Sequence, residues 1–288
     1  MSREGTHAHT LRLRHAIALG LLQGPAELLP VSSSAHTTLV PFLAGWPYAE
    51  LDPTLRKSFE VALHAGTAAA LLTRRPHAHG EPRPALSALA AGVAPPALAG
   101  YALGSRIERR LGTPSTIAAG LLGGSVAMAG AEMAARSGDG QQARDGARPG
   151  VRDGLAVGIA QALALFPGVS RSGAALAAAR ARGFSRMDAD RLSWQAGMPV
   201  LAGAALLQSL RLARSQPSTR TTAALAAGAV SAFASTRWSV AMLTPERRSR
   251  TPVACAGYRV ALAALVIRRL RMTAASNAVP IPKNKRLT

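Results

Sequence analysis

The chain has 288 residues, of which 48% are hydrophobic and 4% aromatic, and its formal net charge at pH 7 is +20. Such a charge is typical of nucleic-acid-binding proteins. However, basic residues recur in nearly every connection between apolar segments, and no zinc-finger, helix-turn-helix or basic-aromatic module is present. We therefore expect no nucleic-acid partner. The single cysteine, Cys255, excludes disulfides and cysteine metal sites within one chain.

The apolar segments predict an all-α integral membrane protein, although the mean hydropathy is only +0.14. These segments consist mainly of Ala, Gly and Leu, and small residues allow helices to pack closely in lipid. Arginine crowds the connections, where it suits cytoplasmic loops and anionic head groups. Membrane lipids are therefore expected partners, and the length suits one unit made of two repeats.

The first apolar segment is interrupted by polar residues. Pro30 lacks a backbone N–H and disfavours helical dihedrals at Leu29, so a helix that begins near His15 should end at about Leu28. A second helix should start in the serine run after Pro30, because serine is a strong N-cap residue, and reach Trp46. Both helices are shorter than the roughly 20 residues that a bilayer span requires, which predicts a re-entrant pair.

Three more apolar segments complete a predicted first repeat, residues 1–135. They cover residues 59–72, which are as few as in the first short segment, and the longer stretches 84–104 and 115–135; Pro95-Pro96 should kink the second segment. Residues 136–153 contain Gly, Gln, Asp and Arg with almost no apolar residue, which predicts a solvated linker between two halves.

The second half repeats the interrupted pattern of the first. Another short apolar segment, 154–166, stops at Pro167, and a new helix should run over 172–181. Paired interrupted segments in corresponding halves indicate a polar site near the bilayer midplane, here in two inverted-topology repeats. When Gln161 is laid on Gln23, the matching pairs are Val169 and Val31, Ser170 and Ser32, Ser172 and Ser34, with Arg171 in place of Ser33.

Three further apolar helices complete the second half. They are expected over residues 187–210, 221–243 and 251–267. The second repeat is thus predicted to cover residues 154–270, followed by a basic tail, 271–288.

These motifs resemble those of the undecaprenyl-diphosphatase family (BacA/UppP, the bacitracin-resistance type). Residues 23–36 resemble its (E/Q)xxxE motif followed by PVSSxxH, and residues 167–175 its PGxSRSxxT motif. Residues 58–66 resemble its FEVxIQxG helix, and Tyr258-Arg259 its YR helix. The chain departs from the family where Ala35 replaces Gly, His64 replaces Gln and Ala175 replaces Thr.

The two breaks carry groups that suit a diphosphate. Each presents free N–H groups at a positive helix end, beside hydroxyl donors. The planar guanidinium of Arg171 can bind two phosphate oxygens at once. A carboxylate or guanidinium within lipid costs about 2.5 to 3.5 kcal/mol, so each charge needs a partner. We therefore expect Glu27 and Arg171 to face each other across the substrate. The substrate-binding group is predicted to comprise Gln23, Ser32, Ser34, Gly168, Ser170 and Ser172.

Glu27 alone would repel a diphosphate, so it is predicted to hold a divalent cation, Mg or Ca, that bridges to the substrate. Gln23, one helical turn earlier, can add an oxygen ligand or a hydrogen bond. The resemblance implies the same assignment for Glu27 and a divalent metal requirement. Glu27 and Gln23 are therefore the predicted metal residues.

The nucleophile is left open between two groups. Ser33 matches a family serine implicated in catalysis, and His36, three residues on, is placed to activate it or to protonate the leaving phosphate. Alternatively, Ser33 binds phosphate while a metal-bound water attacks. The predicted catalytic residues are Glu27, Ser33, His36 and Arg171.

The resemblance implies a multi-pass enzyme of the inner (plasma) membrane that hydrolyses undecaprenyl diphosphate to undecaprenyl phosphate and phosphate. This reaction recycles the lipid carrier for peptidoglycan synthesis, and the family's active site faces the extracytoplasmic side. Two alternatives remain: a polyprenyl-phosphate transporter or flippase, since interrupted repeats are also transporter architecture, and a catalytically weakened relative. A homodimer is left open.

Overall fold

The computed structural model describes residues 10–73, 84–137, 144–213 and 219–278. Within these ranges the chain is helical, with one isolated β-bridge between Arg144 and Phe184, so the all-α prediction is confirmed. In chain order the helices are α1 (Leu13–Leu28), α2 (Ser33–Ala44), α3 (Pro53–Leu72), α4 (Leu86–Leu111), α5 (Pro114–Ser137), α6 (Val151–Leu163), α7 (Arg171–Ala181), α8 (Arg186–Ala213), α9 (Thr219–Met242), α10 (Pro245–Ser249) and α11 (Pro252–Ala278).

The helix ends at the first break agree with the sequence prediction, because they depend on neighbouring residues. α1 ends at Leu28 and α2 begins at Ser33. α3 begins earlier than its apolar run, because Asp52 accepts hydrogen bonds from the backbone N–H groups of Leu55 and Thr54 at 3.1 and 2.8 Å. The bond from Leu55 contributes most to holding the pKa of the exposed Asp52 carboxyl below its usual value.

Two predicted boundaries are corrected by the structure. α6 begins at Val151, inside the predicted linker 136–153, because Asp153 in its first turn accepts from the Gly150 N–H at 3.0 Å. α11 continues to Ala278, so the first part of the predicted tail 271–288 is helical, as alanine-rich sequence favours. Residues 138–143 of the linker and 279–288 of the tail lie outside the described residues.

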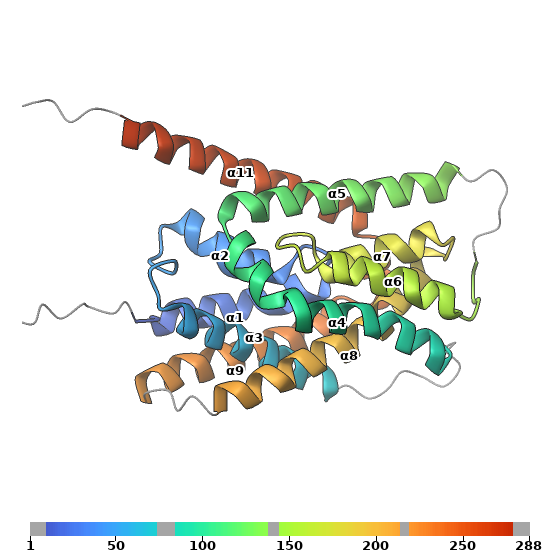
Figure 1. The fold of residues 1–288 in the computed structure, drawn as a ribbon, viewed down its shortest axis with the longest axis horizontal. Coiled ribbons are helices and arrows are strands. Elements are labelled where there is room, and N and C mark those ends of the chain that lie inside the picture. The colour runs from blue at the N-terminus through green and yellow to red at the C-terminus, as the bar shows by residue number, and fades with distance from the viewer. Residues whose placement is uncertain (1–9, 74–83, 138–143, 214–218, 279–288) are drawn as a thin grey trace, which may run out of the picture.

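The two interrupted helix pairs enter the bundle from opposite ends (Figure 1). The outer ends of α1 and α2 lie at the left of the view and those of α6 and α7 at the right, while both breaks lie near the middle. In each break the residue before the restarted helix is a serine with left-handed backbone, Ser32 with φ 73° and Ser170 with φ 69°. Residues other than glycine rarely adopt this conformation, so both breaks contain the same strained turn.

The first arm of each pair packs on a helix from the other half of the chain. α1 packs against α9, and α6 packs against α4. A glycine permits close approach in both contacts: Gly20 faces the Gly228 carbonyl, and Gly158 faces the Ala91 carbonyl. Interfaces of small residues are typical of helices that associate in lipid.

Close helix contact predicts a measurable difference between two glycines. A side chain at Gly66 in α3 would collide with the Ala229 carbonyl in α9, whereas one at Gly130 on the exposed face of α5 would meet open space. We expect Gly66→Ala to destabilise the fold by about 1 to 3 kcal/mol. Gly130→Ala should be neutral or slightly stabilising, because alanine favours helix. Thermal unfolding in one detergent measures both variants, and equal shifts would contradict the proposed contact.

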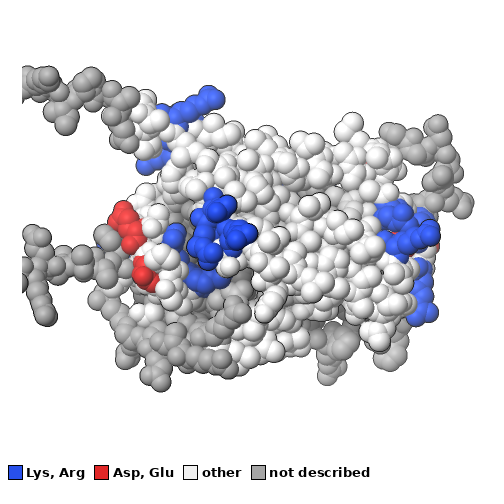
Figure 2. Space-filling view, in the orientation of Figure 1, with Lys and Arg blue, Asp and Glu red and all other residues white. Residues whose placement is uncertain are grey.

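The outer surface has an uncharged band. In Figure 2 lysine and arginine gather toward the two ends of the long axis, and mostly uncharged side chains cover the middle. Large apolar residues are exposed along several helices, among them Leu98, Tyr101 and Val126. Among the described helices, two are long and apolar enough to cross a membrane, over Leu86–Ile107 and Pro114–Arg136.

Candidate active site

Polar residues from the two breaks meet where α1, α2 and α7 converge. Glu27 lies in the last turn of α1, Ser33 begins α2 and Arg171 begins α7. Glu27 Oε1 accepts from Arg171 Nη2 at 2.8 Å, and Oε2 accepts from Ser33 Oγ at 2.6 Å. The carboxylate and the guanidinium that the sequence placed in separate halves are therefore in direct contact.

The end of α1 is positioned by a serine from α9. Ser235 Oγ accepts from the Gly24 N–H at 3.1 Å and donates to the Gly20 carbonyl at 2.9 Å. These two backbone groups stand four residues apart, the spacing of a helical hydrogen bond, so the hydroxyl contacts one rung of the α1 ladder. This contact lies one turn before Glu27 and fixes the direction of the last turn.

Further hydrogen bonds hold the buried ion pair. Glu27 is only 6% exposed, and the side chain of Arg171 is 24% exposed. Arg171 Nη1 also donates to the Gly197 carbonyl of α8 at 2.6 Å, and Gln23 Nε2 lies 3.4 Å from Glu27 Oε2. Because a buried charge without partners is costly, these bonds are what make the carboxylate tolerable in an apolar bundle.

His64 of α3 completes the cluster on the Gln23 side. Its Nδ1 lies 3.4 Å from Gln23 Nε2 and 3.8 Å from Glu27 Oε2. The His64 side chain is 32% exposed, and Ser33 and Arg171 are also partly exposed. The open side of the cluster is therefore formed by an imidazole, a hydroxyl and a guanidinium.

The predicted pairing of Ser33 with His36 is corrected by the structure. His36 Nδ1 lies 2.7 Å from the Ser32 carbonyl, and Nε2 lies 2.7 Å from Tyr258 Oη, with the two rings stacked. Both ring nitrogens are thus engaged away from Ser33, which bonds to Glu27 instead. The reason is the packing of α11, which places Tyr258 beside the first turn of α2.

Arg259 in α11 joins the two breaks. It is fully buried, and its guanidinium donates to the Pro30 carbonyl at 3.2 Å and to the Gly168 and Val169 carbonyls at 3.0 and 2.9 Å. The Tyr258-Arg259 pair carries part of the family resemblance, but the sequence predicted no role for either residue. A lone arginine inside an apolar helix was the available signal, because such a residue requires internal partners.

The remaining predicted substrate residues shape the turns. Ser32 and Ser34 have their Oγ atoms 3.4 Å apart, and Ser170 and Ser172 repeat this spacing. Ser170 also caps α7 by accepting from the Gly173 N–H at 3.2 Å. Gly168 has φ 92° and faces the Ile117 carbonyl, so a side chain there would be strained and blocked.

Two further positions singled out in the sequence lie away from Glu27: Gln161, the counterpart of Gln23 in the second half, and Ala175, which replaces the family's Thr. Gln161, the counterpart of Gln23, donates to the Gly92 carbonyl at 3.2 Å, and this carbonyl lacks its helical donor because Pro96 has no N–H. Ala175 is 1% exposed and packs in an apolar cluster with Val157. Neither side chain contributes a polar contact to the ion pair.

The donor atoms near Glu27 are compatible with a hard divalent cation only if the substrate shares it. No group of three or more His, Cys, Asp or Glu side chains suited to a metal occurs in the described part of the chain. Glu27 offers one carboxylate, whereas Gln23 presents its amide nitrogen to Glu27 and would supply its oxygen after a rotation of the amide group. Mg²⁺ is commonly held by one or two carboxylates together with substrate phosphates.

The fold and this cluster define an all-helical protein in which two interrupted helix pairs bring a carboxylate, a hydroxyl and a guanidinium together inside the bundle. Residues 16–265 match the family described as Bacitracin resistance protein BacA. The chain belongs to this family of membrane proteins, as the resemblance in its motifs predicted.

Curated relatives named undecaprenyl-diphosphatase cover most of the chain. The one from Pelobacter propionicus is 34% identical over 274 residues, 89% of this chain and 97% of the relative. That from Geobacter sulfurreducens is 38% identical over 248 residues, 80% and 88% of the two chains. That from Geobacter metallireducens is 38% identical over 217 residues, 69% and 77%.

Proposed function

We propose that this protein hydrolyses undecaprenyl diphosphate to undecaprenyl phosphate and inorganic phosphate, and so returns the lipid carrier to cell-wall synthesis. The observation that carries the proposal is the contact of Glu27 with both Ser33 and Arg171 at the meeting point of the two breaks. The names of the relatives identify the substrate class. A diphosphate suits the site because it presents several anionic oxygens to Arg171 and to the helix ends.

The proposed architecture is two inverted-topology repeats in the plasma membrane, each with a re-entrant helix pair. Its support is the opposite entry of the pairs in Figure 1, the equal backbone turns at Ser32 and Ser170, and the matching contacts of α1 with α9 and α6 with α4. The isoprenoid chain then lies against the apolar outer surface while the diphosphate enters from the extracytoplasmic side.

In the proposed reaction Ser33 is the nucleophile and Glu27 its base. The Ser33 hydroxyl proton passes to Glu27 Oε2, and Oγ attacks the terminal phosphorus. The bond from that phosphorus to the bridging oxygen breaks, and undecaprenyl phosphate leaves with its electron pair. Water then hydrolyses the phosphoserine and restores the hydroxyl. Arg171 holds the phosphoryl oxygens on which charge accumulates.

Glu27 and Gln23 are the residues that would hold a divalent cation, Mg²⁺ or Ca²⁺, when the diphosphate is bound. Such a cation neutralises phosphate charge and orients the leaving group. The proposed function is tested by phosphate release from undecaprenyl diphosphate with purified protein in detergent, with and without a chelator. Release that stops with the chelator and returns with Mg²⁺ or Ca²⁺ supports the enzyme and its cation; absence of release under every condition favours a lipid carrier instead.

His64 gives a prediction that depends on its neighbours. In the family this position is usually Gln, and an amide can still reach Gln23 and Glu27 by hydrogen bonding. We therefore expect His64→Gln to keep kcat within about threefold. His64→Leu removes the hydrogen bond to Gln23 and should lower kcat by about tenfold, which corresponds to roughly 1.4 kcal/mol for one hydrogen bond. Steady-state phosphate release compares the two. Equal loss in both variants would assign a specific chemical role to the imidazole.

A further inference from the structure

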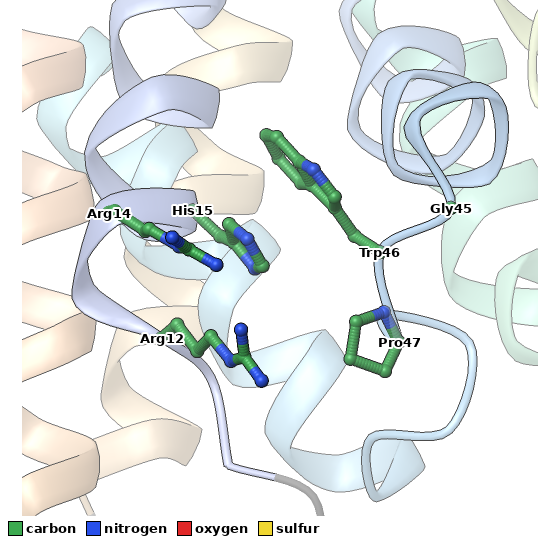
Figure 3. Close-up of a pocket in the computed structure, with 6 residues that line it drawn as sticks. All are labelled: Arg12, Arg14, His15, Gly45, Trp46 and Pro47. Atoms are coloured by element: carbon green, nitrogen blue, oxygen red, sulfur yellow. The ribbon is translucent and has the colours of Figure 1, made fainter.

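A recess lies at the outer end of the first interrupted pair, where α1 begins and α2 ends (Figure 3). Its volume is about 590 Å³. One side is formed by Arg14 and His15 of α1 and by Arg12, the residue just before the helix. The opposite wall is formed by Gly45, Trp46 and Pro47, which follow α2. At 1.5 Å per residue, about 18 Å of α1 separates His15 from Glu27, so this recess is distinct from the candidate active site.

The recess is basic and lacks an acidic counterpart. Within the described residues, no carboxylate forms an ion pair with Arg12 or Arg14, and no group forms a hydrogen bond with a ring nitrogen of His15. His15 is nevertheless 8% exposed, and its ring stacks on Trp46 with centroids 4.1 Å apart and planes 4° apart. The imidazole is mostly buried, yet its ring nitrogens carry no hydrogen bond within the described residues and are not sealed off from the recess that His15 lines. Together with the two exposed guanidinium groups beside it, it indicates a ligand that supplies oxygen atoms and negative charge.

The backbone adds to the same preference. α1 has no side-chain cap at Arg12, and the His15 N–H donates to the Arg12 carbonyl at 3.0 Å. The N–H groups of Leu13 and Arg14 precede the helical ladder and lie at the positive end of the helix. Guanidinium groups and a helix N-terminus both favour phosphate. The site therefore combines two kinds of phosphate donor with a stacked aromatic wall.

The surroundings favour a phosphate that is attached to a lipid. Tryptophan prefers the membrane-water interface, and arginine extends its head group from apolar surroundings toward lipid phosphates. Leu13, Ile17 and Leu21 follow at every fourth residue along one face of α1 and are 54%, 38% and 54% exposed. This apolar stripe runs from the outer end of α1 along the helix and offers a surface to an acyl chain.

We propose that the recess binds the phosphate of an anionic membrane lipid and thereby holds the outer end of the α1 and α2 pair at the membrane surface. The lipid bound there is not the substrate, because the recess contains none of the residues proposed for catalysis. Loss of this lipid contact is expected to leave kcat unchanged.

The test uses fluorescence of Trp46 in a Trp194→Phe/Trp238→Phe background. Phosphatidylglycerol with brominated acyl chains is titrated into the protein in detergent, in parallel with brominated phosphatidylcholine. We expect quenching at lower concentration by phosphatidylglycerol. Arg12→Gln/Arg14→Gln should weaken this affinity about 25-fold, since each basic side chain near an anionic lipid contributes roughly fivefold. The matched control is Arg109→Gln/Arg110→Gln, which removes equal charge from exposed positions at the end of α4.

Three results would overturn the proposal: equal affinity for the two lipids, equal loss in the two double variants, or displacement of brominated phosphatidylglycerol by an equal concentration of inorganic phosphate. The last result would identify free phosphate as the ligand. Unchanged kcat for phosphate release in Arg12→Gln/Arg14→Gln verifies that the variant is folded. The quenching readout is independent of catalysis, so failure of the proposed function would not affect it.

Discussion

Replacing Glu27 by Gln is expected to lower kcat for phosphate release by at least about 100-fold while the protein stays folded. The amide has the size of the carboxylate and can still accept a hydrogen bond from Arg171. In the parent protein Ser33 Oγ lies 2.6 Å from Glu27 Oε2. The amide cannot take the Ser33 proton, and it carries no charge for a divalent cation. Removal of a positioned base typically costs 10²- to 10⁴-fold, which sets the expected range.

Glu132 supplies the control for this variant. It is also buried, at 4% exposure, and it forms ion pairs with Arg136, Arg180 and Arg186. Glu132→Gln therefore removes the same charge from a comparable environment that contains no Ser33 and no second break. We expect it to lower the thermal midpoint but to keep kcat within about twofold. Similar kcat losses in both variants would show that Glu27 acts through the fold and would remove it from the reaction.

The breaks were predictable from sequence because the forces that create them are local. Pro30 ends α1 through its missing N–H and its effect on Leu29, and serine favours a helix start, so the boundaries depend on residues next to one another. The expectation that Glu27 and Arg171 meet at one site followed from a different argument, and the structure brings them into direct contact rather than leaving them apart across a substrate. A charge in an apolar segment requires a partner, and the two halves have corresponding breaks, one beside Glu27 and one at Arg171. The similarity of the halves therefore indicated that these two residues meet.

The direction of individual side chains was not predictable, because distant helices determine it. His36 and Ser33 are three residues apart, which allows contact on one helix face, yet Tyr258 of α11 draws the imidazole away. The Ser235 hydroxyl reaches α1 from α9, and Arg259 reaches both breaks from α11. A single sequence specifies none of these approaches, since they depend on how the helices pack rather than on local preference.

Ser33→Ala is the second variant for which a large effect is expected, and it distinguishes the two nucleophiles that the sequence left open. If Ser33 Oγ attacks phosphorus, the variant loses the covalent route and kcat should fall by about 10³-fold or more, with little change in KM. If Ser33 only binds phosphate while water attacks, KM should rise and kcat should fall by no more than about 100-fold, the upper value of one hydrogen bond to a charged group.

Ser34→Ala is the matched control, because Ser34 is the next residue, is exposed and makes no contact with Glu27; its Oγ lies 3.4 Å from Ser32 Oγ. Because Ser34 belongs to the predicted substrate-binding group, its loss is expected to raise KM, whereas kcat should stay within about threefold of the parent. Loss of Ser33 leaves Glu27 with the bonds from Arg171 and Gln23, so the ion pair should survive and unfolding should shift little. A Ser33→Ala protein with a parental thermal midpoint and a phosphate-release rate near that of Ser34→Ala would exclude the hydroxyl as nucleophile, and the base function of Glu27 would then have to act on water.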